Sequence, residues 1–120
     1  MTKTKIAWAD AAWNPILGCT RVSSGCANCF AVPIAYAHSM HKNPKIADAY
    51  AGLTIVRENG NVDWSGIVRL LPDRLDQPSR WRKPRRVFVN SMSDLFHESL
   101  CYSDISEVFD ALRAAPQHTY

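Results

Sequence analysis

The sequence has no long hydrophobic run. No stretch of its 120 residues approaches the ~18 consecutive apolar residues that a membrane-spanning helix needs. Residues 1–5 are basic, as at the start of a signal peptide, but Asp10 interrupts the apolar residues that follow, so no hydrophobic signal core forms. These absences lead us to expect no membrane partner and a cytoplasmic location.

A large excess of charge is also missing. The 14 Lys and Arg residues face 11 Asp and Glu residues, and a net charge of +3 does not by itself indicate a nucleic-acid partner. Ordinary numbers of proline and glycine, with 47% hydrophobic residues, exclude a disordered or collagen-like chain. The length is sufficient for one compact domain, so we treat residues 1–120 as a single domain.

Cysteine is scarce, but three of the 4 cysteines lie close together as Cys19-x₆-Cys26-x₂-Cys29. The two-residue spacing suits both tetrahedral zinc and an iron–sulfur cluster, because each needs neighbouring sulfur ligands. Gly25 allows a tight turn there, and Cys19 can return across the longer loop. Disulfides are the poorer interpretation without an export signal. We therefore predict that the three thiolates converge on one metal centre.

The number of ligands separates the two metal interpretations. A structural zinc requires a fourth protein ligand. A 4Fe-4S cluster held by three cysteines instead leaves one iron open for a substrate or cofactor. The third alternative is a set of ordinary thiols without metal. The candidates for a fourth zinc ligand are His38, His41, His97 and Cys101.

The order of apolar segments predicts an α/β fold. An extended segment near residues 13–17 precedes the cysteines, and a helix of about three turns follows them over residues 30–41. Residues 53–58 and 62–64 flank Asn59-Gly60, which indicates a β-hairpin, and residues 67–71 add a third extended piece.

The second half of the chain reads as a βαβ unit. Residues 72–77 begin with proline and acids, as a short helix does. Residues 86–90 are the clearest strand, with an apolar run that we expect to be buried on both faces. Residues 103–113 are the clearest helix, which we expect Ser103 to cap, and residues 117–120 begin another strand. This order is typical of a parallel sheet.

Polar residues follow the clearest strand. Asn90, Ser91, Ser93 and Asp94 lie at its carboxyl end, where α/β proteins place functional groups. Ser93 or Asp94 can equally well cap a turn. His97 and Glu98 come next in the chain, as an acid–base pair, metal ligands or a solvated loop end.

One segment concentrates the positive charge. Residues 80–86 carry five cations around Trp81 and contain no acid. Such a segment can bind nucleic-acid phosphates and stack on a base. The alternative is a solvated surface loop, because Pro78 and Pro84 mark a connection. The five cations are Arg80, Arg82, Lys83, Arg85 and Arg86.

Three segments resemble one known family. Residues 13–31, which run from Trp13-Asn14-Pro15 through the cysteines to Phe30-Ala31, resemble the opening of the phage gene-product thirty-seven/sixty-eight family of three-cysteine-motif proteins. The resemblance continues in residues 85–98 and 115–120. Phe30 stands where that family usually has tyrosine. The family has no established activity.

The layout of this family is similar to that of radical S-adenosylmethionine enzymes. The similarity implies that Cys19, Cys26 and Cys29 each bind one iron of a 4Fe-4S cluster, whose open iron chelates S-adenosylmethionine. Those enzymes usually have C-x₃-C-x₂-C with an aromatic residue before the last cysteine, whereas here the first gap is longer and Phe30 follows Cys29. The residues expected to contact the cofactor are Phe30, Asn90, Ser91 and Asp94.

The resemblance also predicts the architecture. It implies the N-terminal part of a TIM-like partial barrel, with a parallel sheet of βα units and an inserted β-hairpin. Since such a barrel needs about 200 or more residues, we expect residues 1–120 to be a fragment of a longer chain with an exposed sheet edge.

Two functional hypotheses follow from these patterns. The first is an iron–sulfur protein of radical S-adenosylmethionine type with an unknown substrate. The alternative is a non-catalytic, phage-derived zinc-binding module that contacts nucleic acid. In either case an adjacent gene is a plausible source of a partner protein.

Overall fold

The computed structural model describes residues 2–3, 6–20 and 29–120, so that Cys26 lies outside the described residues. Within them the protein is a mixed α/β structure with short sheets, and these residues form no closed barrel. The predicted α/β class is therefore confirmed in its coarse form.

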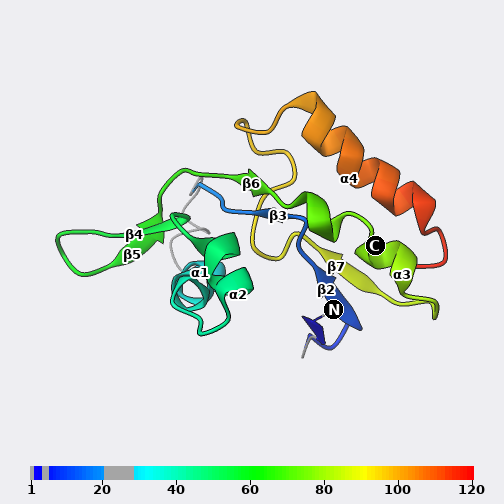
Figure 1. Ribbon diagram of the computed structural model, residues 1–120, viewed down its shortest axis with the longest axis horizontal. Coiled ribbons are helices and arrows are strands. Elements are labelled where there is room, and N and C mark those ends of the chain that lie inside the picture. Colours follow the sequence, from blue (N-terminus) through cyan, green and yellow to red (C-terminus); the bar gives the residue numbers. More distant parts are fainter. Residues whose placement is uncertain (1, 4–5, 21–28) are drawn as a thin grey trace.

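The main sheet joins the two ends of the chain. It has the strand order β1 (Thr2–Lys3), β2 (Ala11–Trp13) and β7 (Val87–Val89). β1 is antiparallel to β2, whereas β2 and β7 are parallel. Figure 1 shows β2 and β7 side by side near the middle of the molecule. Parallel strands bring their carboxyl ends to the same edge of the sheet, which matters for the site below.

A proline divides the first predicted strand between two sheets. β2 ends at Trp13, and after Asn14-Pro15 the chain enters β3 (Ile16–Leu17), which pairs antiparallel with β6 (Arg69–Leu70). Proline has no N–H to donate to a ladder, so pairing cannot run unbroken through residue 15. The expectation of one strand over residues 13–17 was wrong for this reason.

Several local predictions are confirmed. A helix follows the cysteine segment, the Asn59-Gly60 turn joins a hairpin, and the long C-terminal helix forms. The short helix predicted at Pro72 is divided into a 3₁₀ turn and one α-helical turn. These elements are α1 (Ala31–Ser39), β4 (Thr54–Val56), β5 (Val62–Trp64), the 3₁₀ helix η2 (Pro72–Arg74), α3 (Gln77–Arg80) and α4 (Tyr102–Ala114).

One helix was not predicted. α2 (Pro44–Tyr50) begins at Asn43, whose side-chain oxygen accepts a hydrogen bond from the Lys45 backbone N–H at 3.0 Å. Asparagine at the N-cap followed by proline in the first turn is a recognised start signal. The sequence therefore contained the information for this helix.

Two details of the βαβ unit differ from expectation. The N-cap of α4 is Cys101 with no side-chain cap, because the helix begins at Tyr102 and places Ser103 inside its first turn. β7 is only partly buried: the Val87 side chain is 3% exposed, but Phe88 is half-buried against the exposed ring of Trp8. The final segment does pair with β7, because the Val87 N–H donates to the Thr119 carbonyl at 2.7 Å.

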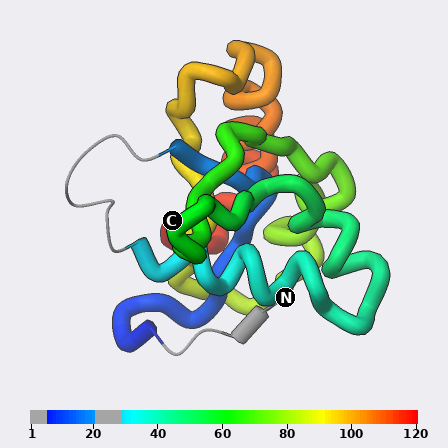
Figure 2. Tube along the Cα trace, turned by 90° about the vertical axis from the view of Figure 1, so that its left-hand side faces the viewer, coloured from blue at the N-terminus to red at the C-terminus, as the bar shows by residue number. Residues whose placement is uncertain are grey.

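Two hydrophobic cores flank the strands. One contains Leu17 and residues of α1, and the other contains Trp13, Ile16 and Val108 of α4. Ile16 and Leu17 enter different cores because successive side chains of a strand point to opposite faces. Figures 1 and 2 show α1 and α2 on one side of the strands and α4 on the other. None of the helices in the described residues is long and apolar enough to cross a membrane.

An ion pair ties β2 to β7 at their amino ends, and it makes stability depend on pH. Asp10 accepts hydrogen bonds from the Arg86 side chain at 3.0 Å and from its backbone N–H at 2.8 Å, which lower the pKa of Asp10 from 3.8 to about 2. The carboxylate therefore stabilises the fold above pH ~4 and loses that contribution as the pH falls toward 2. We expect Asp10→Asn to lower the urea midpoint at pH 6, and the difference from the parent chain to shrink at pH 2.5. A difference that stayed constant with pH would contradict the assignment.

Candidate functional site

The cysteine segment begins where the chain passes close to the residues that follow β7. The Gly18 N–H donates to the Met92 carbonyl at 3.2 Å, and Gly18 forms a parallel bridge with Ser93. Gly18 has a φ of 98°, and a Cβ there would overlap the carbonyl oxygen of Ile67, so only glycine fits. Cys19 is therefore placed directly beside the segment that follows β7.

Cys29 stands at the other end of the cysteine segment, just before α1. Both Cys19 and Cys29 are half-buried, and both pack against the core that contains Leu17, Val32 and Met92. The structure thus brings two of the three predicted ligands to the same core. The described residues contain no group of three or more metal-ligating side chains, and the predicted three-cysteine set includes Cys26, which lies outside them.

The Asn90 side chain is buried without a hydrogen-bond partner, and its backbone is left-handed. Its φ is 58°, a left-handed conformation that non-glycine residues rarely adopt, and its side chain is 8% exposed. Neither its amide nitrogen nor its amide oxygen has a hydrogen-bond partner, and the buried Ser93 hydroxyl is likewise unpaired. Unsatisfied buried polar groups cost about 1–3 kcal/mol each. Three such atoms after β7 leave hydrogen bonds open to an ordered water or to a ligand.

The other polar residues of this segment already have protein partners. The Ser91 hydroxyl donates to the Asn14 side-chain oxygen at 3.1 Å, which links the ends of β7 and β2. Asp94 accepts a hydrogen bond from the Phe96 N–H at 2.9 Å and so caps a turn. This was one of the two roles that the sequence allowed for it. Asn90 is therefore the strongest of the predicted cofactor contacts.

His97 holds the cysteine segment against the loop after β7. The Ser99 N–H donates to His97 Nδ1 at 3.0 Å, so the neutral ring carries its proton on Nε2. That nitrogen lies 2.8 Å from the Thr20 hydroxyl, to which it donates. The His97 side chain is 7% exposed. Neither Thr20 nor Gly18 was singled out from the sequence, although both adjoin Cys19.

The remaining fourth-ligand candidates lie away from Cys29. His38 is near the far end of α1, which at about 1.5 Å per residue puts it roughly 10 Å along the axis from the first turn. His41 lies beyond the helix end. Cys101 is exposed and contacts Ser103 and Asp104 of its own helix. Zinc ligands must converge within about 2.3 Å of one ion, so these positions disfavour a site closed by them.

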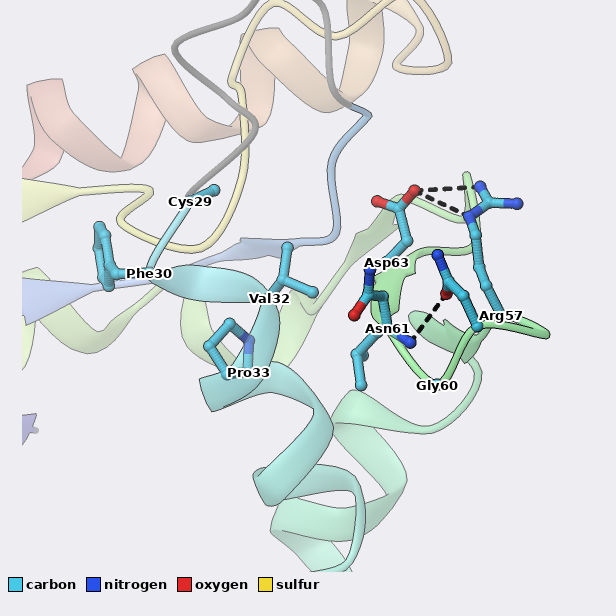
Figure 3. Close-up of a pocket in the computed structure, with 10 residues that line it drawn as sticks. Cys29, Phe30, Val32, Pro33, Arg57, Gly60, Asn61 and Asp63 are labelled. Carbon is cyan, nitrogen blue, oxygen red and sulfur yellow. Dashed lines mark hydrogen bonds and ion pairs between the residues drawn. The ribbon is translucent and has the colours of Figure 1, made fainter.

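A pocket opens beside Cys29. It has a volume of about 690 Å³ and lies between the start of α1 and the β4–β5 hairpin. Figure 3 shows Cys29 and Phe30 on one side, and on the other Arg57 with its ion pair to Asp63. The Phe30 side chain is 56% exposed. A small organic molecule fits this volume within reach of the Cys29 segment.

The basic segment is partly neutralised. Arg86 pairs with Asp10 at 3.0 Å, and Arg80 pairs with Asp76 at 3.2 Å. The Arg85 guanidinium lies 5.9 Å from the centroid of the Trp81 ring. The segment is therefore less concentrated than its sequence indicates, and nucleic-acid binding through it stays a prediction. The exposed cations outside these contacts are Arg82 and Lys83.

These features define a mixed α/β protein whose cysteine segment starts at Gly18, beside the residues that follow the parallel strand β7. The chain belongs to the family described as protein of unknown function DUF5131, whose model matches residues 3–120. Among curated proteins and solved structures nothing matches significantly.

Proposed function

We propose that the chain is an iron–sulfur protein of radical S-adenosylmethionine type, with Cys19, Cys26 and Cys29 as ligands of a 4Fe-4S cluster. The observation that carries the proposal is that Cys19 and Cys29 pack against the same core, and that Cys19 adjoins Gly18, which bridges to Ser93 after the carboxyl end of β7. Carboxyl ends of parallel strands are where α/β enzymes bind cofactors.

The donor set suits the proposed cluster. Half-buried thiolates are soft ligands that favour iron–sulfur clusters and zinc. The histidines that would complete a zinc site are unsuited to it: His38 lies at the far end of α1, and His97 Nε2 is engaged with Thr20. A 4Fe-4S cluster of this type needs only three protein ligands, and this requirement, together with the resemblance in sequence, supports the cluster over the zinc site.

The chain's own residues have distinct tasks in this proposal. A cluster of this kind supplies one-electron reduction of S-adenosylmethionine when it is bound. The unpaired amide of Asn90 is placed to orient polar groups of that cofactor, and His97 positions the Cys19 segment through Thr20. The pocket between Phe30 and the hairpin is the proposed place for the substrate.

The same proposal extends to architecture. We propose that β2 and β7 are strands of a partial barrel, since they are parallel and connected through helices. α4 then follows β7 as the next βα unit, and Thr119 begins the strand after it.

Anaerobic purification tests the function. We expect a brown protein with a broad absorption band near 400 nm, and with iron and sulfide in equal amounts. After reduction with dithionite, the loaded protein should convert S-adenosylmethionine to 5′-deoxyadenosine. A colourless protein with one tightly bound zinc would overturn the proposal in favour of the zinc-binding module. A loaded cluster without 5′-deoxyadenosine would retain the metal centre but refute the radical reaction.

A further inference from the structure

A second cavity lies away from the cysteines. It has a volume of about 290 Å³ and is enclosed by the end of β2, the C-terminal part of α1, α2 and the η2–α3 segment. The described residues that line it include no carboxylate. Its polar lining residues are Asn14, His38, His41, Tyr50, Arg74 and Gln77.

Three of these residues present hydrogen-bond donors. Arg74 lines the cavity, donates from one guanidinium nitrogen to the Asn14 carbonyl at 2.9 Å and also hydrogen-bonds the Tyr50 side chain, and its guanidinium has five N–H donors in all. The Asn14 side-chain oxygen accepts from Ser91, so its amide nitrogen is left as a donor. Burial raises the pKa of Tyr50, although Arg74 acts in the opposite direction. The Tyr50 hydroxyl is therefore protonated at neutral pH.

The histidines add to this donor character. His41 Nδ1 accepts a hydrogen bond from the Asn43 N–H at 3.0 Å, so the neutral ring has its proton on Nε2. His38 Nδ1 is buried and has no hydrogen-bond partner. Burial lowers the pKa of His38, and the electrostatic influence of His41 and Arg74 lowers it further. An anion in the cavity would offset all three effects.

The geometry points to a phosphate site. We propose that the cavity binds the phosphate group of a small phosphate monoester, held by the Arg74 fork with donors from Asn14 and His41. Guanidinium groups match the oxygens of phosphate in a two-point contact. A metal ion is the poorer occupant, because His41 has its only lone pair engaged with Asn43.

A larger groove indicates what the phosphate is attached to. It has a volume of about 660 Å³ and shares Ile46, Arg74 and Gln77 with the cavity. Its lining carries charges of both signs, with Asp48 and Asp73 among the cations, while Arg69 donates to the Ala49 carbonyl at 2.8 Å and Arg80 pairs with Asp76. A groove of this kind suits an uncharged, hydroxylated group, so the ligand class is a sugar phosphate. This site is independent of the proposed cluster.

Calorimetric titration of the whole chain tests the site with ribose 5-phosphate, inorganic phosphate, acetate and ribose. We expect ribose 5-phosphate to bind most tightly, inorganic phosphate more weakly, and ribose and acetate not measurably. Arg74→Gln should weaken binding at least about tenfold. His41→Gln should weaken binding several-fold. This second variant tests the site even if Arg74→Gln does not fold. The control is Arg82→Gln, which removes the same charge from the exposed basic segment.

An independent readout is the NMR titration of His38, assigned by comparison with His38→Gln. Saturating ribose 5-phosphate should raise the pKa of His38, because the anion opposes the electrostatic influence of His41 and Arg74. The proposal is overturned if Arg82→Gln weakens binding as much as Arg74→Gln, if acetate binds as tightly as phosphate, or if the His38 pKa does not move.

Discussion

Replacement of Cys19 or Cys29 by serine is expected to reduce the iron and sulfide of the anaerobically reconstituted protein to background. Loss of an outer hydrogen-bond partner already costs metal sites about 10–100-fold in affinity, and loss of a thiolate ligand costs more. Serine preserves the size of the side chain but offers a hard oxygen, which iron–sulfur clusters do not favour. Iron and sulfide assays together with the absorption near 400 nm measure the effect. Cys26→Ser should behave in the same way.

The matched control is Cys101→Ser. Cys101 is exposed at the start of α4 and contacts only its own helix in the described structure, so its loss should leave the cluster intact. Circular dichroism of each variant shows whether the fold persists. Equal loss of iron in Cys101→Ser, or full retention in Cys19→Ser and Cys29→Ser, would refute the ligand assignment.

Gly18→Ala is expected to be among the most destabilising single substitutions in the chain. Alanine would have to adopt a φ of 98° and overlap the Ile67 carbonyl. Backbone strain of this kind costs about 1–3 kcal/mol, and overpacking costs about as much again. We expect a loss of about 3 kcal/mol or more in the free energy of unfolding, measured by urea denaturation. The cluster should also be lost, because Cys19 can no longer follow the bridge to Ser93.

Gly66→Ala separates the effect of backbone strain from the effect of steric overlap. Gly66 has a similar φ of 93°, but a Cβ there meets no atom within 4 Å. This variant therefore carries the backbone strain without the collision, and should lose only about 1–2 kcal/mol. If both variants lose the same stability, the close approach of Gly18 to Ile67 is not what fixes the start of the cysteine segment.

Local patterns predicted the elements well, and pairings between distant segments poorly. α1, the hairpin and α4 follow from apolar spacing and turn residues within a dozen positions. The change of sheet at Pro15 depends on β6, which lies far along the chain. α2 has a local start signal at Asn43 that was not used.

The candidate site was also predicted where local sequence determines it, and missed where distant segments meet. The sequence placed Cys19 and Asn90 at strand ends, because those positions follow from chain order alone. The contact between Thr20 and His97 joins two loops, and no periodicity reports it. The cavity around Arg74 is assembled from four separate segments. His38 and His41 drew attention as metal ligands, whereas His41 accepts a hydrogen bond from the Asn43 N–H and both rings line the Arg74 cavity.

The passage of the chain through Pro15 has a consequence for folding. Ile16 and Leu17 are adjacent, yet one is part of the α4 core and the other of the α1 core. Neither core can open without displacing a residue anchored in the other, so the two should unfold as one cooperative unit. The cysteine segment starts immediately after this junction. A metal centre held there would be released by disruption of either helix layer, and its colour would report the integrity of the whole domain.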